Sequence, residues 1–230
     1  MTQWIGGLGI IMFTIAVLPI FGVSGLQVFA AEASGPTHDK VHPRIGITAK
    51  WIWGIYTGLT FILVILLMLG GMNWFDSICH AFATTGTGGY STKQASVAYY
   101  HSPYIEYVIS LFMFVSGINF TLLLFFVNRK FKKVIDNAEL KWYFWSVTGF
   151  TTVIAVILYY TSSMGMDEAF RKSLFQVISL HTSTGFATDD YMLWTPVLWG
   201  LLTIVMVIGA CAGSTTGGLK CIRMVILAKV

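Results

Sequence analysis

Five stretches of the chain lack charged residues and are long enough to cross a lipid bilayer. A helical span needs about 20 apolar residues, because the hydrocarbon core is about 30 Å thick. Charged residues make up 10% of the sequence, whereas ordinary soluble domains carry about 25%. We therefore predict an all-α polytopic membrane protein with about five spans. The charge-free stretches are residues 1–31, 51–75, 107–128, 142–166 and 191–219.

One segment between two of these stretches is rich in glycine and hydroxyl residues. Residues 83–92 read Ala-Thr-Thr-Gly-Thr-Gly-Gly-Tyr-Ser-Thr. Glycine lets the chain turn its carbonyls inward through conformations that a Cβ disfavours, and each hydroxyl adds another oxygen. A ring of such oxygens can replace the water shell of a dehydrated alkali cation. Taken alone, the segment would more simply be a surface turn, but two further features favour ion binding.

The first feature is a repeat at an interval of 96 residues. Residues 89–92, Gly-Tyr-Ser-Thr, align with residues 185–188, Gly-Phe-Ala-Thr. The second feature is the short segment before each copy, at about 74–84 and 168–180, which is too brief to cross the hydrocarbon core. Such segments indicate re-entrant helices. The chain thus contains a repeated unit of helix, re-entrant pore loop and helix.

The re-entrant helices would favour a cation near the middle of the membrane. A helix that enters from outside ends there with its carbonyl end, which is the negative end of its dipole. The chain then climbs back and lines a narrow pore with backbone carbonyls, so selectivity requires no acid, base or nucleophile. The predicted filter residues are Thr87, Gly88 and Gly89 in one copy and Ser183, Thr184 and Gly185 in the other.

Three polar residues near this predicted pore each allow two interpretations. Asp189 and Asp190 lie just outside the second copy, where they either concentrate cations at the mouth or form a solvated cap. Asn119 lies at membrane depth and must face protein or water. It either packs against other helices or lines the pore.

The last apolar stretch is interrupted by small residues. Residues 209–218 read Gly-Ala-Cys-Ala-Gly-Ser-Thr-Thr-Gly-Gly, a run poor at holding a helix. Non-helical backbone at that depth is tolerated only beside protein or water. The run is either a flexible plug below the filter or simple close packing of small residues. The predicted gating residues are Gly209, Gly213, Ser214, Thr215, Thr216, Gly217, Gly218 and Lys220.

The same run does not fit a phosphate-binding loop. The Walker pattern requires Gly-Lys-Ser/Thr at its end. Here the order is Gly-Leu-Lys-Cys over residues 218–221, and no strand is predicted before it. Nucleotide binding at this position is therefore excluded.

Basic residues are distributed unequally between the two predicted sides of the membrane. Eleven of the 14 lysines and arginines lie in residues 32–50, 129–141 and 220–230. The positive-inside rule places these three segments in the cytoplasm. The basic clusters are then topology signals, and we expect no nucleic-acid binding.

These motifs resemble the Trk/Ktr/HKT superfamily of potassium uptake proteins, and most closely the Trk membrane subunit. The matching pieces extend along essentially the whole chain in the family's order. They are Thr2-Gln3-Trp4-Ile5-Gly6-Gly7, Glu32-Ala33-Ser34-Gly35-Pro36, Pro43-Arg44-Ile45, Thr48-Ala49-Lys50, Thr87-Gly88-Gly89-Tyr90-Ser91-Thr92, Ser102-Pro103-Tyr104-Ile105-Glu106, Thr184-Gly185-Phe186 and Gly213-Ser214-Thr215-Thr216-Gly217-Gly218-Leu219-Lys220.

The resemblance implies a pseudo-fourfold pore of helix-loop-helix units, each with one key filter glycine, here Gly89 and Gly185. It further implies potassium as the transported ion, no organic cofactor, a homodimer, a cytoplasmic nucleotide-binding regulatory subunit and a bacterial cytoplasmic membrane. The implied parts are the second helix of the first unit (1–31), a cytoplasmic linker (32–48), the complete second unit (49–128), a basic linker (129–141) and the third unit (142–230) with an intramembrane gating loop (209–220).

The sequence departs from the family pattern in that the first and fourth filter strands are missing. We therefore expect the chain to be a fragment of a potassium transporter. A membrane scaffold whose Gly/Thr loops only pack helices is the alternative. An intramembrane enzyme is not expected, because His80, His101 and His181 have no partnered Ser, Cys or Asp at a suitable spacing.

Overall fold

The computed structural model describes residues 1–7, 45–162 and 164–227. Most of the predicted first span and its linker lie outside them. Within the described residues the regular elements are helices, and an isolated bridge joins Ile208 to Leu219. The all-α class is confirmed. The helices are α1 (Thr2–Gly7), α4 (Ile45–Leu69), α5 (Trp74–Thr85), η2 (Ser96–Tyr100), α6 (Pro103–Ser116), α7 (Phe120–Val127), α8 (Phe131–Ile135), α9 (Ala138–Thr161), α10 (Met166–His181), η3 (Tyr191–Leu193), α11 (Pro196–Val207) and α12 (Cys221–Leu227).

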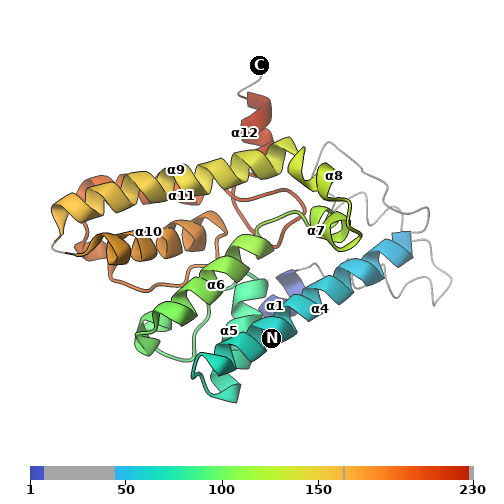
Figure 1. Ribbon diagram of the computed structural model, residues 1–230, viewed down its shortest axis with the longest axis horizontal. Coiled ribbons are helices and arrows are strands. Elements are labelled where there is room, and N and C mark those ends of the chain that lie inside the picture. Colours follow the sequence, from blue (N-terminus) through green and yellow to red (C-terminus); the bar gives the residue numbers. More distant parts are fainter. Residues whose placement is uncertain (8–44, 163, 228–230) are drawn as a thin grey trace.

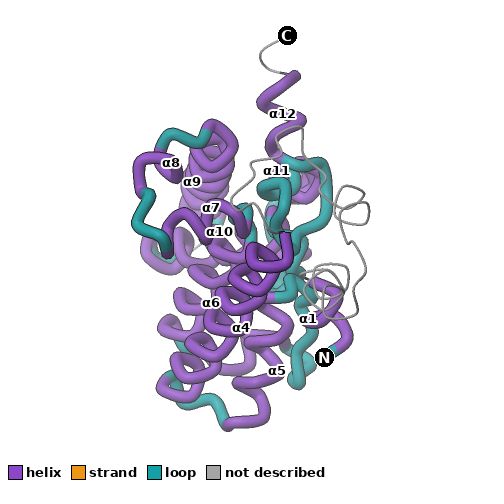
Figure 2. The backbone as a smooth tube through the Cα atoms, turned by 90° about the vertical axis from the view of Figure 1, so that its right-hand side faces the viewer, coloured by secondary structure: helices purple, strands orange, loops and turns teal. Residues whose placement is uncertain are grey.

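The helices form two groups that correspond to the two copies of the repeat. In the first group α5 packs against α4 and α6, and α1 contacts α5. In the second group α10 packs along α9 and also contacts α11. Figure 1 shows the first group below the second, and the two meet where α6 contacts α10. The short helix α12 projects from the rest of the chain (Figure 2).

Two helices in the described part of the chain are long and apolar enough to cross a membrane. They are Ala49–Leu69 within α4 and Ala138–Thr161, which is α9. The predicted fifth span is shorter than its apolar stretch, because α11 has 12 residues and is therefore about 18 Å long at 1.5 Å per residue. Its helix stops where the small residues of the 209–220 segment begin.

The third predicted span is not one straight helix: it is a broken span or a re-entrant loop. α6 and α7 are separate helices that meet at a bend of 102°. The break has a physical cause, since the 209–220 segment takes up the backbone groups exposed there. The Cys211 amide donates to the Gly117 carbonyl, and the Phe120 amide donates to the Gly213 carbonyl, both at 3.1 Å. Asn119 begins α7 by accepting a hydrogen bond from an amide of its first turn.

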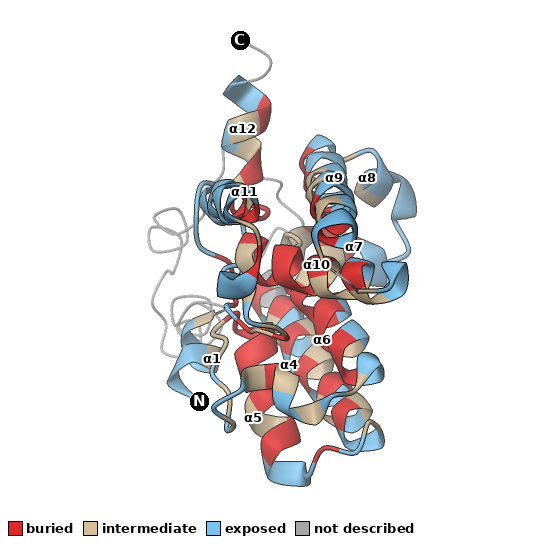
Figure 3. Cartoon of the chain, turned by 90° about the vertical axis from the view of Figure 1, so that its left-hand side faces the viewer, coloured by how far each residue is buried: buried red, intermediate tan, exposed pale blue. Residues whose placement is uncertain are grey.

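Buried residues lie mainly where the helices face one another, and exposed residues lie on their outward faces (Figure 3). Large apolar side chains occur in both sets. Leu67 of α4, Met113 of α6 and Phe175 of α10 are fully buried. In contrast, Phe61 of α4 and Trp145 of α9 are exposed. Outward apolar faces of this kind suit helices that contact hydrocarbon or further membrane helices.

Candidate functional site

Each predicted filter stretch begins at the C-terminal end of a short helix. α5 ends at Thr85 and α10 at His181, within one residue of the ends expected from sequence. Backbone hydrogen bonds beyond these ends repeat at the 96-residue interval, so the sequence repeat is also a repeat of backbone geometry. In the first copy the Gly86 amide donates to Phe82, the Thr87 amide to Thr84, and the Gly88 and Gly89 amides both donate to the Ala83 carbonyl. In the second copy the Thr182 amide donates to Ile178, the Ser183 amide to Leu180, and the Thr184 and Gly185 amides both donate to the Ser179 carbonyl.

Both stretches place alternate residues in the left-handed region. Thr87 and Gly89 have φ of 48° and 64°, and Ser183 and Gly185 have φ of 55° and 85°. A β-branched residue such as Thr87 adopts this region only under strain, which costs about 1–2 kcal/mol. The alternation matters because successive carbonyls of a β-strand point to opposite sides. Alternate left-handed residues allow neighbouring carbonyls to turn toward one side instead.

The two filter stretches meet at Gly89. A Cβ placed on Gly89 would lie 1.9 Å from the carbonyl oxygen of Thr184, so no residue with a side chain fits there without moving the backbone. At Gly185 a Cβ would meet no described atom within 4 Å. Ser183 and Gly185 are exposed, whereas Thr87 and Thr184 are buried. The equivalent glycines therefore have different surroundings despite their shared motif.

The predicted gating segment is non-helical and is held together by close backbone contacts. Its two ends are bridged where the Gly209 amide donates to the Leu219 carbonyl at 2.8 Å and the Leu219 amide donates to the Val207 carbonyl at 3.1 Å. A Cβ on Gly209 would lie 2.2 Å from the carbonyl oxygen of Gly217. Gly209 is therefore required for this close approach.

The same segment contacts both filter stretches. The Thr87 hydroxyl donates to the Thr215 carbonyl at 2.8 Å, and the Thr215 hydroxyl donates to the Thr85 carbonyl at 3.2 Å. A Cβ at Gly217 would come within 3.3 Å of the Ser183 hydroxyl oxygen. The structure thus brings the predicted filter and gating residues together, although Thr87 and Thr215 lie 128 positions apart in sequence.

Glu139 holds the segment from α9, and Lys220 makes a contact within it. The Glu139 carboxylate, buried in the first turn of α9, accepts a hydrogen bond from the Ala212 amide at 2.6 Å. The Lys220 ammonium donates to the carbonyl and hydroxyl oxygens of Thr216. Sequence reasoning missed Glu139. The available signal was an acidic residue at the edge of an apolar span, where ionisable groups are costly.

The expectation that His80 and His181 have no partnered Ser is wrong: His80 of α5 lies beside Ser91, and His181 lies beside Ser146. The His80 Nε2 and the Ser91 hydroxyl oxygen are 2.9 Å apart, and the His80 Nδ1 lies 2.8 Å from the Asp76 carbonyl oxygen. The His80 ring also stacks on Phe186, with centroids 5.7 Å apart. His80 therefore links the outer arm of the first filter stretch to the aromatic residue of the second. The signal was a polar residue on a re-entrant helix near a filter hydroxyl.

The polar residues with two interpretations have structural partners. Asp189 pairs with Lys172 at 3.0 Å, and Asp190 accepts a hydrogen bond from the Met192 amide at the start of η3. Asn119 caps α7 and lies against Gly213. These contacts favour the capping role for the two acids and the packing role for Asn119.

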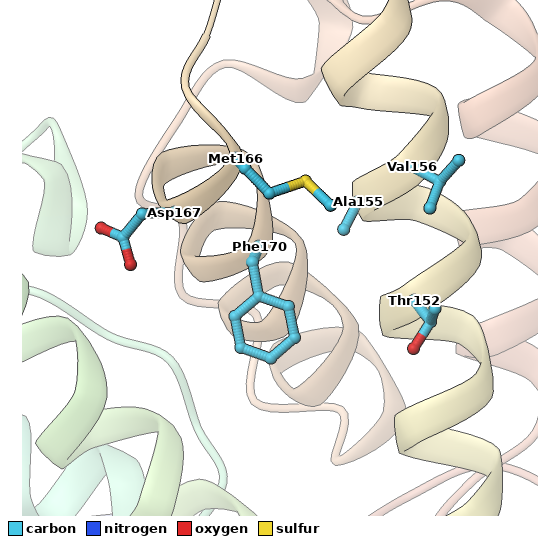
Figure 4. Close-up of a pocket in the computed structure, with 6 residues that line it drawn as sticks. All are labelled: Thr152, Ala155, Val156, Met166, Asp167 and Phe170. Carbon is cyan, nitrogen blue, oxygen red and sulfur yellow. The ribbon is translucent and has the colours of Figure 1, made fainter.

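A shallow hollow lies between α9 and α10, away from these contacts (Figure 4). None of the predicted filter or gating residues lines it. Its lining residues are Thr152, Ala155, Val156, Met166, Asp167 and Phe170.

Known proteins resemble this chain along nearly its whole length. The TrkH potassium uptake protein of Halomonas elongata is 36% identical over 229 residues, which cover 99% of this chain and 48% of that protein. The TrkH protein of Escherichia coli K12 is 40% identical over 236 residues, with 100% and 48% covered. The crystal structure of the potassium transporter TrkH from Vibrio parahaemolyticus superposes with a TM-score of 0.81 at 35% identity, covering 98% of this chain and 46% of that one.

The chain therefore spans about half the length of the curated relatives it matches. The family model described as TrkH, cation transport protein, matches residues 1–230, which is the whole chain. Fold, identity and family model agree, and the chain belongs to the TrkH family of cation transport proteins.

Proposed function

We propose that this chain forms part of a potassium-conducting pore and supplies two of its filter stretches. The observation that carries the proposal is one backbone geometry repeated at Thr87 and Gly89 and again at Ser183 and Gly185. Alternate left-handed residues at the carbonyl ends of two short helices suit a filter made of backbone oxygens. The relatives described above are named potassium uptake proteins. Because the chain spans half of them, a complete ring of oxygens would need further filter stretches.

Potassium in this proposal is the transported ion and is held by carbonyls alone. The carbonyl oxygens of the six predicted filter residues, in the two stretches 87–89 and 183–185, would replace its hydration shell. The C-terminal ends of α5 and α10 would add their negative dipole ends beneath it. Both contributions favour a cation and disfavour an anion.

The 209–220 segment would act as the gate in this pore. It contacts the base of the first filter stretch through Thr87, Thr215 and Thr85, so it lies where it could obstruct the ion path. Glu139 of α9 anchors it by accepting a hydrogen bond from the Ala212 amide. A plug formed by backbone hydrogen bonds can be displaced without unfolding a helix.

Replacing Thr215 with valine tests this gate. The change removes the hydroxyl that donates to the Thr85 carbonyl, a bond worth about 1 kcal/mol. The maximal uptake rate should rise by up to about fivefold, with an unchanged ratio of potassium to sodium uptake. Thr203→Val is the matched control, because its exposed hydroxyl donates to the Trp199 carbonyl within α11. An unchanged rate in Thr215→Val, or an equal rise in the control, would contradict the proposed gate.

The proposed orientation places residues 32–50, 129–141 and 220–230 in the cytoplasm. This surface would meet a cytoplasmic nucleotide-binding regulatory subunit, and we propose that the protein works as a homodimer in a bacterial cytoplasmic membrane. The charge distribution supports the orientation. A reporter enzyme fused after Lys133 should be active only in the cytoplasm, and activity outside would overturn this topology.

Growth at low external potassium tests the function itself. The 230-residue chain and a longer form that retains its flanking coding sequence are expressed in a bacterium lacking potassium uptake. We expect rescue by the longer form alone. Rescue by the short form would support potassium conduction but contradict our expectation that the chain needs further filter stretches. No rescue by either form, despite expression in the membrane, would contradict potassium uptake and favour the scaffold.

A further inference from the structure

An ion pair occupies the same place in both copies of the repeat, with its charges exchanged. In the first copy the Asp76 carboxylate and the Lys93 ammonium are 3.4 Å apart. In the second the Lys172 ammonium and the Asp189 carboxylate are 3.0 Å apart. Both members of the second pair lie 96 positions beyond their equivalents in the first. The repeat has therefore kept the pair while reversing its polarity.

Each pair joins a re-entrant helix to the arm that leaves the filter. Asp76 lies in α5 and Lys172 in α10. Their partners each follow the key filter glycine by four residues. The inner end of each stretch is already held by hydrogen bonds from its backbone amides to the Ala83 carbonyl or the Ser179 carbonyl. The ion pairs hold the outer end, so each filter stretch is fixed at both sides of its glycine.

The helix partner is the more buried member of each pair. The side chain of Asp76 is 5% exposed against 30% for Lys93, and Lys172 is 17% exposed against 26% for Asp189. Exposed ion pairs contribute little to the stability of the fold, but a buried charge that loses its partner destabilises the fold strongly. The buried member therefore constrains where the arm can lie, most strongly in the first copy, because Lys172 also pairs with Glu168 of its own helix at 3.0 Å.

Neutral hydroxyls reinforce the first pair without depending on its sign. The Thr92 hydroxyl donates to Asp76 at 2.5 Å, and the Tyr100 hydroxyl donates to it at 2.9 Å. Burial, together with the bond to Asp76, raises the pKa of the Tyr100 hydroxyl to about 12. It therefore stays protonated at neutral pH. A hydroxyl oxygen can also accept from an ammonium, so both groups can serve a lysine at position 76.

We propose that these two charge-reversed pairs are filter braces, positioning devices that keep the carbonyls of each filter stretch at the spacing required for ion selection. This inference rests on the proposed potassium pore, because its first test measures potassium and sodium uptake. What each unit requires is a complementary pair at the two positions, and either polarity serves. Asp76 and Lys172 are positioning residues in this assignment, because they act through the arm and do not contact the ion.

The test compares single changes with a charge exchange in the longer form of the protein. Asp76→Asn and Lys93→Met should each lower the ratio of potassium to sodium uptake by about threefold to tenfold, the effect of about 1 kcal/mol in relative binding. The double variant Asp76→Lys/Lys93→Asp should recover most of the ratio, since the second copy already uses that polarity. Glu106→Gln is the matched control. It breaks the pair with Arg171 at 2.7 Å, which joins α6 to α10 and does not touch the filter arm.

A loss of folding alone lowers the amount of transporter and the maximal rate but leaves the ratio unchanged. The Glu106→Gln control should behave in this way. If Asp76→Asn does not accumulate, the milder Lys93→Met carries the same prediction. In the second copy Asp189→Asn should have a smaller effect, because Lys172 keeps its pair with Glu168 at 3.0 Å. Single changes that leave the ratio at the wild-type value, or a charge exchange no better than the single changes, would overturn the brace.

A second measurement keeps the brace separate from the function on which it rests. In purified protein, amide hydrogen exchange over residues 90–93 should accelerate in Asp76→Asn and not in Glu106→Gln. Unchanged exchange in Asp76→Asn would contradict the brace whether or not the protein transports. Failure of the wild-type protein to take up potassium would contradict the proposed function and leave this exchange result to decide the brace.

Discussion

Replacing Gly89 with alanine should abolish the preference for potassium over sodium, whereas Gly185→Ala should only weaken it. At Gly89 the new Cβ would lie 1.9 Å from the Thr184 carbonyl oxygen, closer than the 3.0 Å below which real Cβ atoms are essentially never found. The two filter stretches would have to separate by about 1 Å. At Gly185, with φ of 85°, the added Cβ has open space among the described residues and brings only the left-handed strain of about 1–2 kcal/mol.

The difference between the two variants is measured as potassium and sodium uptake at equal amounts of the transporter in the membrane. Gly149→Ala is the control, since a Cβ there meets nothing within 4 Å in the described part of the chain and the position lies inside α9. Alanine in a helix interior is favoured over glycine by about 1 kcal/mol, so the control should be neutral or slightly stabilising. Retained potassium preference in Gly89→Ala would show that the filter assignment is wrong.

Gly209→Ala should raise the maximal uptake rate by about tenfold or more while leaving ion preference intact. The added Cβ would lie 2.2 Å from the Gly217 carbonyl oxygen. The clash would break the bridge in which the Gly209 amide donates to Leu219 and the Leu219 amide donates to Val207. Losing two backbone hydrogen bonds costs about 2 kcal/mol. This free energy shifts the equilibrium between the seated and the displaced loop more than tenfold toward the displaced form.

The control for this variant comes from the helix that precedes the loop. Gly200→Ala in α11 adds a Cβ with no described neighbour within 4 Å, and its uptake should match the wild type. The rate is measured at saturating potassium, with the quantity of protein in the membrane determined in parallel. A lower rate in Gly209→Ala at normal protein levels would contradict a loop that obstructs the pore and would instead make it part of the ion path.

The two short helices before the filter stretches could be predicted closely because their limits are set by nearby residues. α5 begins after Asn73, whose side-chain oxygen accepts the Asp76 amide, and it ends before Gly86. The non-helical run from Gly209 could be anticipated for a similar reason, since small residues and glycines hold a helix poorly. In each case the deciding interaction lies within a few residues, so a local pattern was sufficient.

The break between α6 and α7 could not be predicted, because its apolar sequence is the same for a straight helix and a bent one. The break depends on two hydrogen bonds to residues almost a hundred positions later: the Cys211 amide donates to Gly117, and the Gly213 carbonyl accepts from Phe120. Glu139 was missed for the same reason, as its partner is the Ala212 amide, 73 positions away. The roles of the filter and gating residues stay predictions until transport is measured.

By itself the sequence determined the membrane character of the chain, the two short helices before the filter stretches and the glycines that permit left-handed backbone. Hydropathy and backbone freedom are properties of each residue and its neighbours, so they can be read without a partner. Only the tertiary structure decided that Gly89 is crowded and Gly185 is open, that the loop contacts Thr87, and that the two ion pairs are charge-reversed equivalents. These features depend on which carbonyl, amide or charge approaches from a distant helix, and such distances arise only when the two units pack together.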